Sequence, residues 1–338
     1  MMPATSDTPR VIRLRDPRTG QSDGVIEAHS SSALADIARR ARKAQVDWQA
    51  LGFEGRIAVL RRFGQAVEAH RPEIAAALER DTGRRRIAGI EVGSLHGTLA
   101  GAAAAAGAFD AQDWIEGRAS PHIRHSPQWA PYSLVGVISP WNFPFLLSMI
   151  DAIPALVAGC AVIVKPSEVT PRFVAPLTAA IAEVPELTDV LTFVPGDGAT
   201  GQALVDLVDC VCFTGSVPTG RRVAIQGAGR LIPAFLELGG KDPLIVLEGA
   251  DLDAAATAAL RGAALSTGQA CQSIERIYVA RQVHDEFLER LTTLADHVRL
   301  NWPDISQGDI GPIIFERQAE ILRTQIEDAR ARGARILT

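Results

Sequence analysis

The feature that most constrains the fold is an alternation of strand and helix patterns between residues 134 and 238. Five short apolar runs are separated there by segments long enough to form helices. Such alternation is typical of a parallel sheet with helices on both faces. We therefore predict an α/β fold for this part of the chain. The expected strands are Leu134–Ile138, Ala161–Val164, Val190–Val194, Cys210–Phe213 and Ala234–Leu238.

The residues that follow these strands indicate where a ligand would bind. Ligands of parallel α/β sheets bind beyond the carboxyl ends of the strands. Each strand here is followed by polar or glycine-rich residues. One such loop is ordinary, but five in succession indicate one extended site. The loops are Ser139-Pro140-Trp141-Asn142-Phe143-Pro144, Lys165-Pro166-Ser167-Glu168, Pro195-Gly196-Asp197-Gly198, Thr214-Gly215-Ser216 and Gly239-Gly240.

Two of these loops carry groups that suit a dinucleotide. Gly215 and Ser216 lie at a strand-to-helix turn, where free backbone N–H groups and the helix dipole can hold a phosphate, although the same pair also occurs in ordinary turns. Glu168 can accept hydrogen bonds from both hydroxyls of an adenosine ribose, which favours NAD because a 2′-phosphate would meet a like charge. Alternatively, Glu168 caps the next helix. Lys165 is either a ribose or phosphate contact or a solvated strand end.

A second group of residues suits nucleophilic chemistry. Cys271 lies in the small-residue turn Gly268-Gln269-Ala270-Cys271-Gln272. Its thiol has an ordinary pKa of about 8.5 and needs a base to become a thiolate. Glu237 can take that proton, directly or through water, if burial raises its own pKa. The side-chain amide of Asn142 and the Cys271 backbone N–H can stabilise the oxyanion formed when the thiolate attacks an aldehyde.

In this scheme, collapse of the tetrahedral adduct transfers hydride to a nicotinamide and leaves a thioester, which Glu237 then hydrolyses by activating water. Each residue also has a simpler interpretation. Cys271 alone would be a small buried residue in a turn, Glu237 a solvated acid at a strand end, and Asn142 a turn residue. It is the combination of the three, placed by three loops, that favours chemistry.

The remaining segments frame this site. Helices are expected over residues 33–49, 56–70, 72–81 and 87–109, with Ser31 or Ser32 as the first cap and Gly83 as a stop. Residues 110–131 suggest a two-stranded arm. Beyond Asp242 a second block is expected, with strands over 243–247 and 274–280. Its helices are expected from Asp251 or Asp253 to Leu265, over 283–298 and over 316–332. Residues 334–337 read as the start of another strand.

Composition and charge exclude several classes of function. The chain has 338 residues and a net charge of −5, so nothing indicates nucleic-acid binding. Its four cysteines show no paired spacing, and Cys160, Cys210 and Cys212 fall in apolar runs, which indicates core residues and a reducing, cytoplasmic setting. The N-terminus does not resemble a signal peptide. His122 and His125 lack further ligands nearby, so no metal site is expected. The apolar stretch 145–164 is interrupted by prolines and predicts a buried helix and strand rather than a membrane span.

Five blocks of this sequence together resemble the NAD(P)-dependent aldehyde dehydrogenase family. They occur in that family's order and spacing, and the resemblance covers the whole chain. The blocks are Pro140-Trp141-Asn142-Phe143-Pro144, Lys165-Pro166-Ser167-Glu168, Phe213-Thr214-Gly215-Ser216, Glu237-Leu238-Gly239-Gly240-Lys241 and Gly268-Gln269-Ala270-Cys271.

The resemblance implies an enzyme that oxidises a small-molecule aldehyde to a carboxylic acid with NAD, or alternatively NADP. Cys271 would be the nucleophile, Glu237 the general base and Asn142 the oxyanion donor. It also implies a Rossmann-like cofactor domain over 1–110 and 132–239, an oligomerisation arm over 111–131 and a thiol domain over 240–338, in a homodimer or homotetramer. The expected cofactor contacts are Ser139, Pro140, Trp141, Lys165, Ser167, Glu168, Gly198, Phe213, Gly215, Ser216, Leu238 and Gly239.

The chain departs from the family pattern at its C-terminal end. Family members continue with a Glu-x-Phe-Gly-Pro block that grips the nicotinamide ribose and with a strand that pairs across the dimer, so we expect a truncated chain. Two alternatives stay open. One is a non-catalytic relative that binds dinucleotide or full-length subunits. The other is a CoA-acylating dehydrogenase, which would release its product by thiol attack and would not need Glu237.

Overall fold

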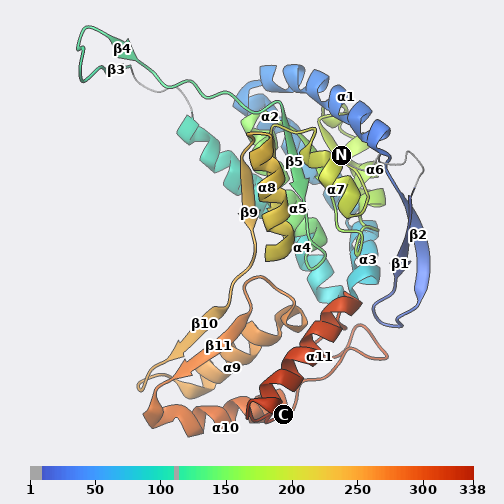
Figure 1. The fold of residues 1–338 in the computed structure, drawn as a ribbon, viewed down its shortest axis with the longest axis vertical. Coiled ribbons are helices and arrows are strands. Elements are labelled where there is room, and N and C mark those ends of the chain that lie inside the picture. Colours follow the sequence, from blue (N-terminus) through green and yellow to red (C-terminus); the bar gives the residue numbers. More distant parts are fainter. Residues whose placement is uncertain (1–9, 110–113) are drawn as a thin grey trace.

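A five-stranded parallel sheet organises the larger body of the protein (Figure 1). The structure is a computed structural model that describes residues 10–109 and 114–338. The strand order is β7-β6-β5-β8-β9, and every pairing is parallel. The predicted α/β class is confirmed, and each expected strand is present with ends shifted by at most one residue. The strands are β5 Leu134–Ile138, β6 Ala161–Lys165, β7 Leu191–Phe193, β8 Cys210–Thr214 and β9 Ala234–Glu237.

Helices cover both faces of this sheet because its central strands are apolar on both sides. Along β6, Val162 and Val164 belong to a core shared with α2, α4, α5 and α6, while Ala161 and Ile163 belong to a core shared with α1, α7 and α8. This division follows from the alternation of side chains along a strand. The helices are α1 Ser31–Ala50, α2 Gly52–Ala69, α3 Arg71–Thr82, α4 Arg85–Ala106, α5 Pro144–Ala158, α6 Val174–Ala182, α7 Gly198–Val205 and α8 Val217–Gly229.

The apolar stretch 145–164 folds as predicted, as the buried helix α5, a turn at Gly159 and the buried strand β6. Gly159 adopts a left-handed φ of 105° that closes the helix. In the part of the chain that the structure describes, no helix combines the length and apolarity needed to cross a membrane.

Two signals at helix ends can be compared with the structure. Gly83 ends α3 with a φ of 65°, as predicted. The first cap was predicted one or two residues late, because the Ser30 hydroxyl, rather than that of Ser31 or Ser32, accepts the hydrogen bond from the Ala33 N–H. Ahead of α1, β1 Arg10–Arg15 and β2 Ser22–Ala28 form an antiparallel pair.

A narrow hairpin projects from the larger body (Figure 1). Its strands, β3 Ile115–Glu116 and β4 Arg124–His125, pair antiparallel. The predicted two-stranded arm is therefore present, although residues 110–113 at its base lie outside the described residues. The arm exposes several large apolar side chains, namely Trp114, Ile115, Ile123 and Trp129.

A smaller body follows β9 and contains a second parallel pair of strands. These are β10 Asp242–Val246 and β11 Ile274–Val279, packed on α9 Leu252–Ala264 and α10 His284–Ala295. The last helix, α11 Glu316–Ala331, starts beside the larger body, where Glu316 pairs with Arg15, and runs away from it to the C-terminus beside α10 (Figure 1). The strand predicted over residues 334–337 is wrong, because this segment is irregular and no described strand pairs with it.

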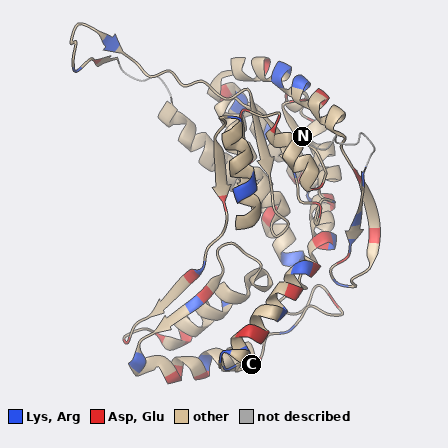
Figure 2. Cartoon of the chain, in the orientation of Figure 1, with Lys and Arg blue, Asp and Glu red and all other residues tan. Residues whose placement is uncertain are grey.

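Charged residues of both signs are interspersed along the outer helices, including α10 and α11 (Figure 2). Some of them pair within one helix, as do Arg39 with Asp36 and Arg290 with Glu286. Such exposed pairs contribute little to stability.

The segment 299–315 connects α10 to α11 and packs against the larger body. The Asn301 side-chain amide donates to the Gly83 carbonyl at 2.8 Å, and Arg18 donates to the Asn301 and Pro303 carbonyls at 2.8 and 2.7 Å. A Cβ at Gly83 would lie 2.5 Å from Pro312 Cγ, so the glycine is required for this approach as well as for its positive φ. The two bodies thus meet at this segment as well as through the chain between β9 and β10.

Candidate active site

The strand-end loops lie along one edge of the large sheet. Ile138 of β5 is in register with Lys165 on one side and Phe213 on the other, and Thr214 is in register with Glu237. The chain first adds β6 and β7 on one side of β5 and then adds β8 and β9 on the other side. The direction in which strands are added therefore switches between the neighbouring strands β5 and β8. Such a switch point is where doubly wound sheets leave a crevice for ligands. The predicted meeting of these loops at one edge is therefore borne out by the register.

Lys165 and Glu168 form an ion pair at the end of β6. Lys165 Nζ donates to Glu168 Oε2 at 2.8 Å. Lys165 is only 4% exposed, so it is not a solvated strand end. Glu168 does not cap α6 either, because that helix begins at Val174. Nearby, the buried Ser167 hydroxyl accepts from the Val169 N–H at 3.2 Å and shapes the turn. The pair leaves a half-exposed carboxylate beside a buried ammonium.

The beginning of α8 forms the next part of this edge. A Cβ at Gly215 would lie 2.7 Å from the Phe213 ring, so the turn can pass over that ring only with glycine. The Ser216 hydroxyl donates to Thr219 Oγ1 at 3.2 Å and does not cap the helix. The first turn of α8 therefore presents its backbone N–H groups without a side-chain cap, as an anion site requires.

Helix α8 also lies unusually close to β9. A Cβ at Gly220 would come within 2.4 Å of Leu238 Cδ2, so Leu238 fills the space that glycine leaves. Gly239 follows with a φ of 76° and directs the chain toward β10.

The other predicted cofactor contacts have mainly local roles in this structure. The buried Ser139 hydroxyl shares a 2.8 Å hydrogen bond with Ser148. Pro140 and Trp141 are half-buried, and the Trp141 carbonyl accepts from Thr170 at 3.2 Å. Gly198 begins α7 behind the Asp197 cap, and a Cβ there would meet nothing within 4 Å.

Asn142 connects the large sheet to the turn that holds the cysteine. Its Nδ2 donates to the Gln269 carbonyl at 2.9 Å, two residues before Cys271. An amide nitrogen carries two hydrogens, so one remains for another acceptor. Asn142 is therefore more than a turn residue, because it joins the loop after β5 to the cysteine turn.

The cysteine turn is strained, and hydrogen bonds to the 311–314 segment hold it in place. Ser266 and Thr267 adopt φ values of 60° and 61°, which are unfavourable for residues with a Cβ and most of all for β-branched threonine. The Thr267 hydroxyl donates to the Gly311 carbonyl and accepts from the Gly311 N–H, both at 3.0 Å. These paired bonds stabilise the strained geometry.

Gln269 is the main anchor of this turn, and sequence reasoning did not assign it a role. Its Nε2 donates to the Ser266 and Pro312 carbonyls at 3.1 and 3.0 Å, and its Oε1 accepts from the Ile314 N–H at 2.9 Å. The side chain is 8% exposed. The signal available in the sequence was a polar residue, Gln269, placed between the small residues Gly268 and Ala270 just before Cys271.

Cys271 is half-buried and interacts electrostatically with Glu237. Burial raises the pKa of the Cys271 thiol, and the negative charge of Glu237 raises this pKa further, while the backbone N–H groups of Cys271 and Gln272 oppose the shift. Glu237 Oε1 accepts from the Gly239 N–H at 3.0 Å. The burial that the sequence argument required of Glu237 is not found, because its side chain is exposed. The arrangement therefore brings together a thiol, a carboxylate that influences it, and an amide that contacts the same turn.

Asp151 is a further acid near this carboxylate. It lies on α5, and burial first and then the charge of Glu237 raise its pKa to about 6. A single charge within the apolar stretch 145–164 was the sequence signal for it.

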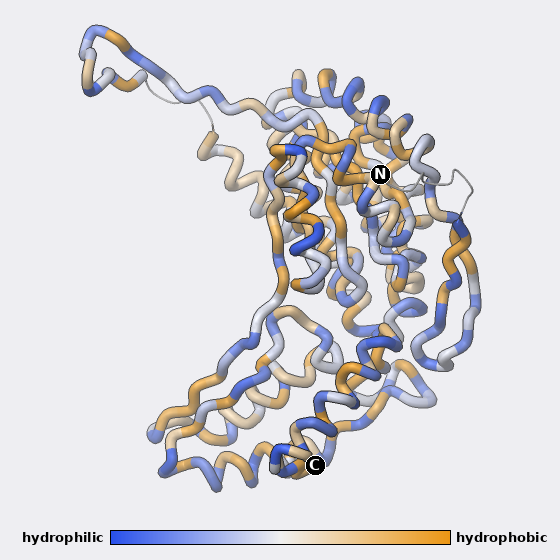
Figure 3. Tube along the Cα trace, in the orientation of Figure 1, coloured by the Kyte–Doolittle hydropathy of each residue, from blue (hydrophilic) through white to orange (hydrophobic). Residues whose placement is uncertain are grey.

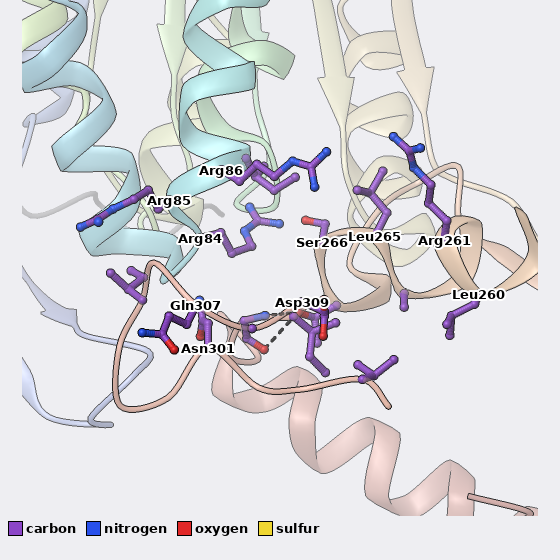
Figure 4. Close-up of a pocket in the computed structure, with 18 of the residues that line it drawn as sticks. Arg84, Arg85, Arg86, Leu260, Arg261, Leu265, Ser266, Asn301, Gln307 and Asp309 are labelled. Carbon is purple, nitrogen blue, oxygen red and sulfur yellow. Dashed lines mark hydrogen bonds between the residues drawn. The ribbon is translucent and has the colours of Figure 1, made fainter. Parts of the chain in front are cut away.

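A cavity of about 800 Å³ lies between the start of α4, α9 and the 297–311 segment. Phe143, Ser266 and Thr267 line it together with Arg84, Arg261 and His297. Figure 4 shows Arg84 extending from the start of α4 toward the segment that holds Ser266. None of Asn142, Glu237 and Cys271 lines this cavity. It neighbours the cysteine turn, and the candidate reaction centre is defined by the side-chain contacts described above.

Fold and site together define an α/β protein that places a cysteine opposite the carboxyl edge of a doubly wound parallel sheet. The chain belongs to the aldehyde dehydrogenase family, whose sequence model matches residues 4–338. The resemblance seen in the five sequence blocks is thereby confirmed.

Individual relatives support this assignment. The chain is 36% identical to a provisionally assigned NADP(+) succinate-semialdehyde dehydrogenase of Mycolicibacterium smegmatis, over 94% of this chain and 62% of that protein. The structure of PutA from Anabaena variabilis, itself a provisional aldehyde dehydrogenase, matches with a TM-score of 0.92 and 51% identity over 96% of this chain and 69% of PutA. An NAD-dependent benzaldehyde dehydrogenase from Corynebacterium glutamicum matches with a TM-score of 0.84 and 32% identity over 97% and 72%. The chain thus spans about two thirds of the length of these relatives.

Proposed function

We propose that this chain carries the chemical groups for oxidising an aldehyde to a carboxylic acid with a nicotinamide dinucleotide. The observation that carries the proposal is the meeting of three groups from three loops. Asn142 bonds to the turn of Cys271, and the charge of Glu237 acts on the Cys271 thiol. Family membership agrees with this reaction, and the succinate-semialdehyde and benzaldehyde enzymes show that relatives act on different aldehydes.

In the proposed mechanism, the Cys271 thiol gives its proton to Glu237, directly or through water, and the thiolate attacks the aldehyde carbon. The free N–H of Asn142 and the Cys271 backbone N–H stabilise the oxyanion. The dinucleotide, when bound, supplies the hydride acceptor that converts the adduct to a thioester. Glu237 then takes a proton from water, which attacks the thioester and releases the acid and the thiol. The exposure of Glu237 suits its access to water.

The residues present fit a dinucleotide at the sheet edge. The uncapped first turn of α8, after Gly215 and Ser216, would hold a phosphate, and the Lys165–Glu168 pair would hold the adenosine ribose. The half-exposed carboxylate of Glu168 disfavours a 2′-phosphate, so we infer a preference for NAD, although one relative carries an NADP(+) assignment. Comparison of kcat/KM for NAD and NADP tests this, and a preference for NADP would contradict it.

We also propose a division of the chain by role. Residues 1–110 and 132–239 would bind the dinucleotide, and 240–338 would supply the thiol. The projecting hairpin within 111–131 would associate with other subunits in a cytoplasmic homodimer or homotetramer, because it exposes Trp114, Ile123 and Trp129. Gel filtration of a variant with all three changed to Ser tests this role. An unchanged oligomeric state would contradict it.

The central experiment measures NADH formation from aliphatic and aromatic aldehydes by this 338-residue chain and by a form extended with any coding sequence that follows it. Cys271→Ala should abolish the activity. Asn142→Ala should lower kcat by about 10²–10³-fold. Glu237→Gln should slow both NADH formation and turnover, because the proposed base serves thiol deprotonation as well as thioester hydrolysis.

Cys212→Ala is the matched control for loss of a thiol, since Cys212 lies on β8 away from the turn. Its activity should stay near that of the unmodified chain. NAD binding without NADH formation in either form would contradict the proposed oxidation, and so would a Cys271→Ala variant that keeps its activity.

A further inference from the structure

Two buried charged residues, Arg84 just before α4 and Glu91 within it, contact the segment 142–146 that carries Asn142, and the proposed mechanism does not yet use them. Arg84 is 4% exposed and Glu91 is fully buried. Arg84 is the N-cap residue of α4, and Glu91 lies seven positions further along the chain, within the helix. Arg84 is the first residue of the basic run Arg84-Arg85-Arg86. The structure separates them, because Arg85 and Arg86 are exposed.

Arg84 contacts the start of this segment, at Asn142 and Phe143. Its Nη2 donates to the Asn142 carbonyl, and its guanidinium lies over the Phe143 ring, 5.2 Å from the ring centroid. Its Nε and Nη1 have no hydrogen-bond partner in the described chain. Burying a guanidinium that makes one hydrogen bond costs folding free energy. A contribution to stability therefore does not explain why Arg84 is buried at Asn142.

Glu91 contacts the end of this segment, which is the first turn of α5. Its Oε2 accepts hydrogen bonds from the Phe145 and Leu146 N–H groups at 3.1 and 3.3 Å. Helix α5 has no side-chain cap of its own at Phe143. Glu91 therefore satisfies two of the free N–H groups at the start of α5 and places a negative charge where the helix dipole favours one.

The two residues also act on each other. Burial lowers the pKa of the Arg84 guanidinium and raises the pKa of the Glu91 carboxyl. The opposite charge of each residue counteracts the pKa shift of the other. A cation at the carbonyl of residue 142 and an anion at the amides of 145 and 146 fix both ends of a five-residue segment. The Asn142 side chain extends from that segment to the Gln269 carbonyl.

We propose that Arg84 and Glu91 are positioning residues for the oxyanion donor Asn142. This inference rests on the proposed function, because it assigns Asn142 that role. The pair orients the Asn142 amide toward the cysteine turn without touching substrate. Loss of either residue should therefore impair oxyanion stabilisation more than it impairs the thiol.

Two reactions of Cys271 that need no dinucleotide separate these effects. With p-nitrophenyl acetate, the thiolate attacks the ester carbon, a C–S bond forms, the C–O bond breaks, and p-nitrophenolate leaves from a tetrahedral oxyanion. With iodoacetamide, the thiolate displaces iodide from carbon and no oxyanion forms. The ratio of the two rates reports the oxyanion donor, and Asn142→Ala sets its lower limit.

We expect Arg84→Gln to lower the ratio of acylation to alkylation by about tenfold, part of the 10²–10³ expected for loss of a donor. Glu91→Gln should lower the ratio by about threefold, because the amide oxygen can still accept one backbone hydrogen bond. Arg84→Lys should restore most of the ratio, since the ammonium keeps the charge and can donate to the Asn142 carbonyl.

Arg85→Gln and Glu79→Gln are the matched controls, because these residues pair with each other on the surface of the same region. Neither should change the ratio. An unchanged ratio in Arg84→Gln and Glu91→Gln, with a lowered one in Asn142→Ala, would overturn the inference while leaving the proposed function intact. An equal fall of both rates would also overturn it, since that indicates general unfolding. If Asn142→Ala itself left the ratio unchanged, the oxyanion role in the proposed function would fail first.

Discussion

The two parallel sheets of this protein differ in how their faces are covered. Every residue of β5 and β6 is buried, whereas β10 and β11 together contain one buried residue, Val246. On β10 the side chains of Leu244 and Val246 face α9 and α10, while Ile245 is 66% exposed. Figure 3 shows the apolar residues that run through both sheets. Parallel sheets are usually covered on both sides, so the small sheet is the exception.

The difference teaches that the two halves of the candidate site are positioned by different forces. Asn142 follows β5 and Glu237 ends β9, and these strands are fixed by apolar burial or by pairing with buried strands. Cys271 depends on a strained turn that Thr267 and Gln269 hold through hydrogen bonds to residues 311–314. Apolar truncation should therefore affect the large sheet, and loss of hydrogen bonds should affect the cysteine turn.

The largest expected effect comes from a matched pair of isoleucine truncations. Ile163→Ala on β6 removes a fully buried side chain and should cost about 2–5 kcal/mol of unfolding free energy. Ile245→Ala on β10 removes an exposed one and should change it by less than about 0.5 kcal/mol. Urea unfolding followed by tryptophan fluorescence measures both. Equal losses would mean that the outer face of the small sheet is covered in solution.

A second pair of substitutions tests the cysteine turn. Gln269→Ala removes three hydrogen bonds from a buried side chain and should weaken the turn by about 3 kcal/mol, at roughly 1 kcal/mol for each bond. The Ile314 amide should then exchange its hydrogen faster. Gln272→Ala, at the exposed neighbour of Cys271, should leave this exchange unchanged. Unaltered protection of Ile314 in Gln269→Ala would show that the turn is held by other contacts.

The smallest effect concerns pH and again separates the two bodies. Burial raises the pKa of Glu91 to about 7 and that of Asp81 to about 6, both in the larger body. In the smaller body, by contrast, backbone and side-chain hydrogen bonds from Ser306 lower the pKa of Asp304. A raised pKa means that the folded state favours the protonated carboxyl, so Glu91 should reduce stability as pH rises from about 4.5 to 7.

Glu91→Gln removes this titration. Between pH 5 and pH 7 the variant should therefore gain about 2 kcal/mol of unfolding free energy relative to the unmodified chain. Urea unfolding at the two pH values measures the difference, with Glu79→Gln at the surface as the control. A constant gap between Glu91→Gln and the unmodified chain at both pH values would refute the assignment.

The large sheet was well predicted from the sequence because the short apolar runs that indicate strands are also the segments that are buried there. All five strands were located, since each is a short apolar run bounded by a helix pattern and a loop. The predicted strand over 334–337 failed for the complementary reason. A few β-prone residues form a strand only beside a pairing partner, which a local pattern cannot reveal.

The candidate site was predictable where motifs carry it, and otherwise not. Asn142 and Cys271 stood out beside glycine, proline and small residues. Arg84 and Gln269 did not, because their importance lies in contacts with segments distant in sequence. Glu237 illustrates the opposite limit, since the sequence singled it out but its role required a burial that the structure does not show.

The contact between Gly220 and Leu238 has a consequence for variation among related sequences. The two residues share one volume, because Leu238 occupies the position that any side chain at 220 would need. Gly220 lies in the first turn of α8, where we propose that a phosphate binds, and Leu238 directly follows Glu237. A larger residue at 220 is compatible with this backbone only alongside a smaller one at 238. Selection on the residue at the start of α8 would in this way also act on the residue next to Glu237.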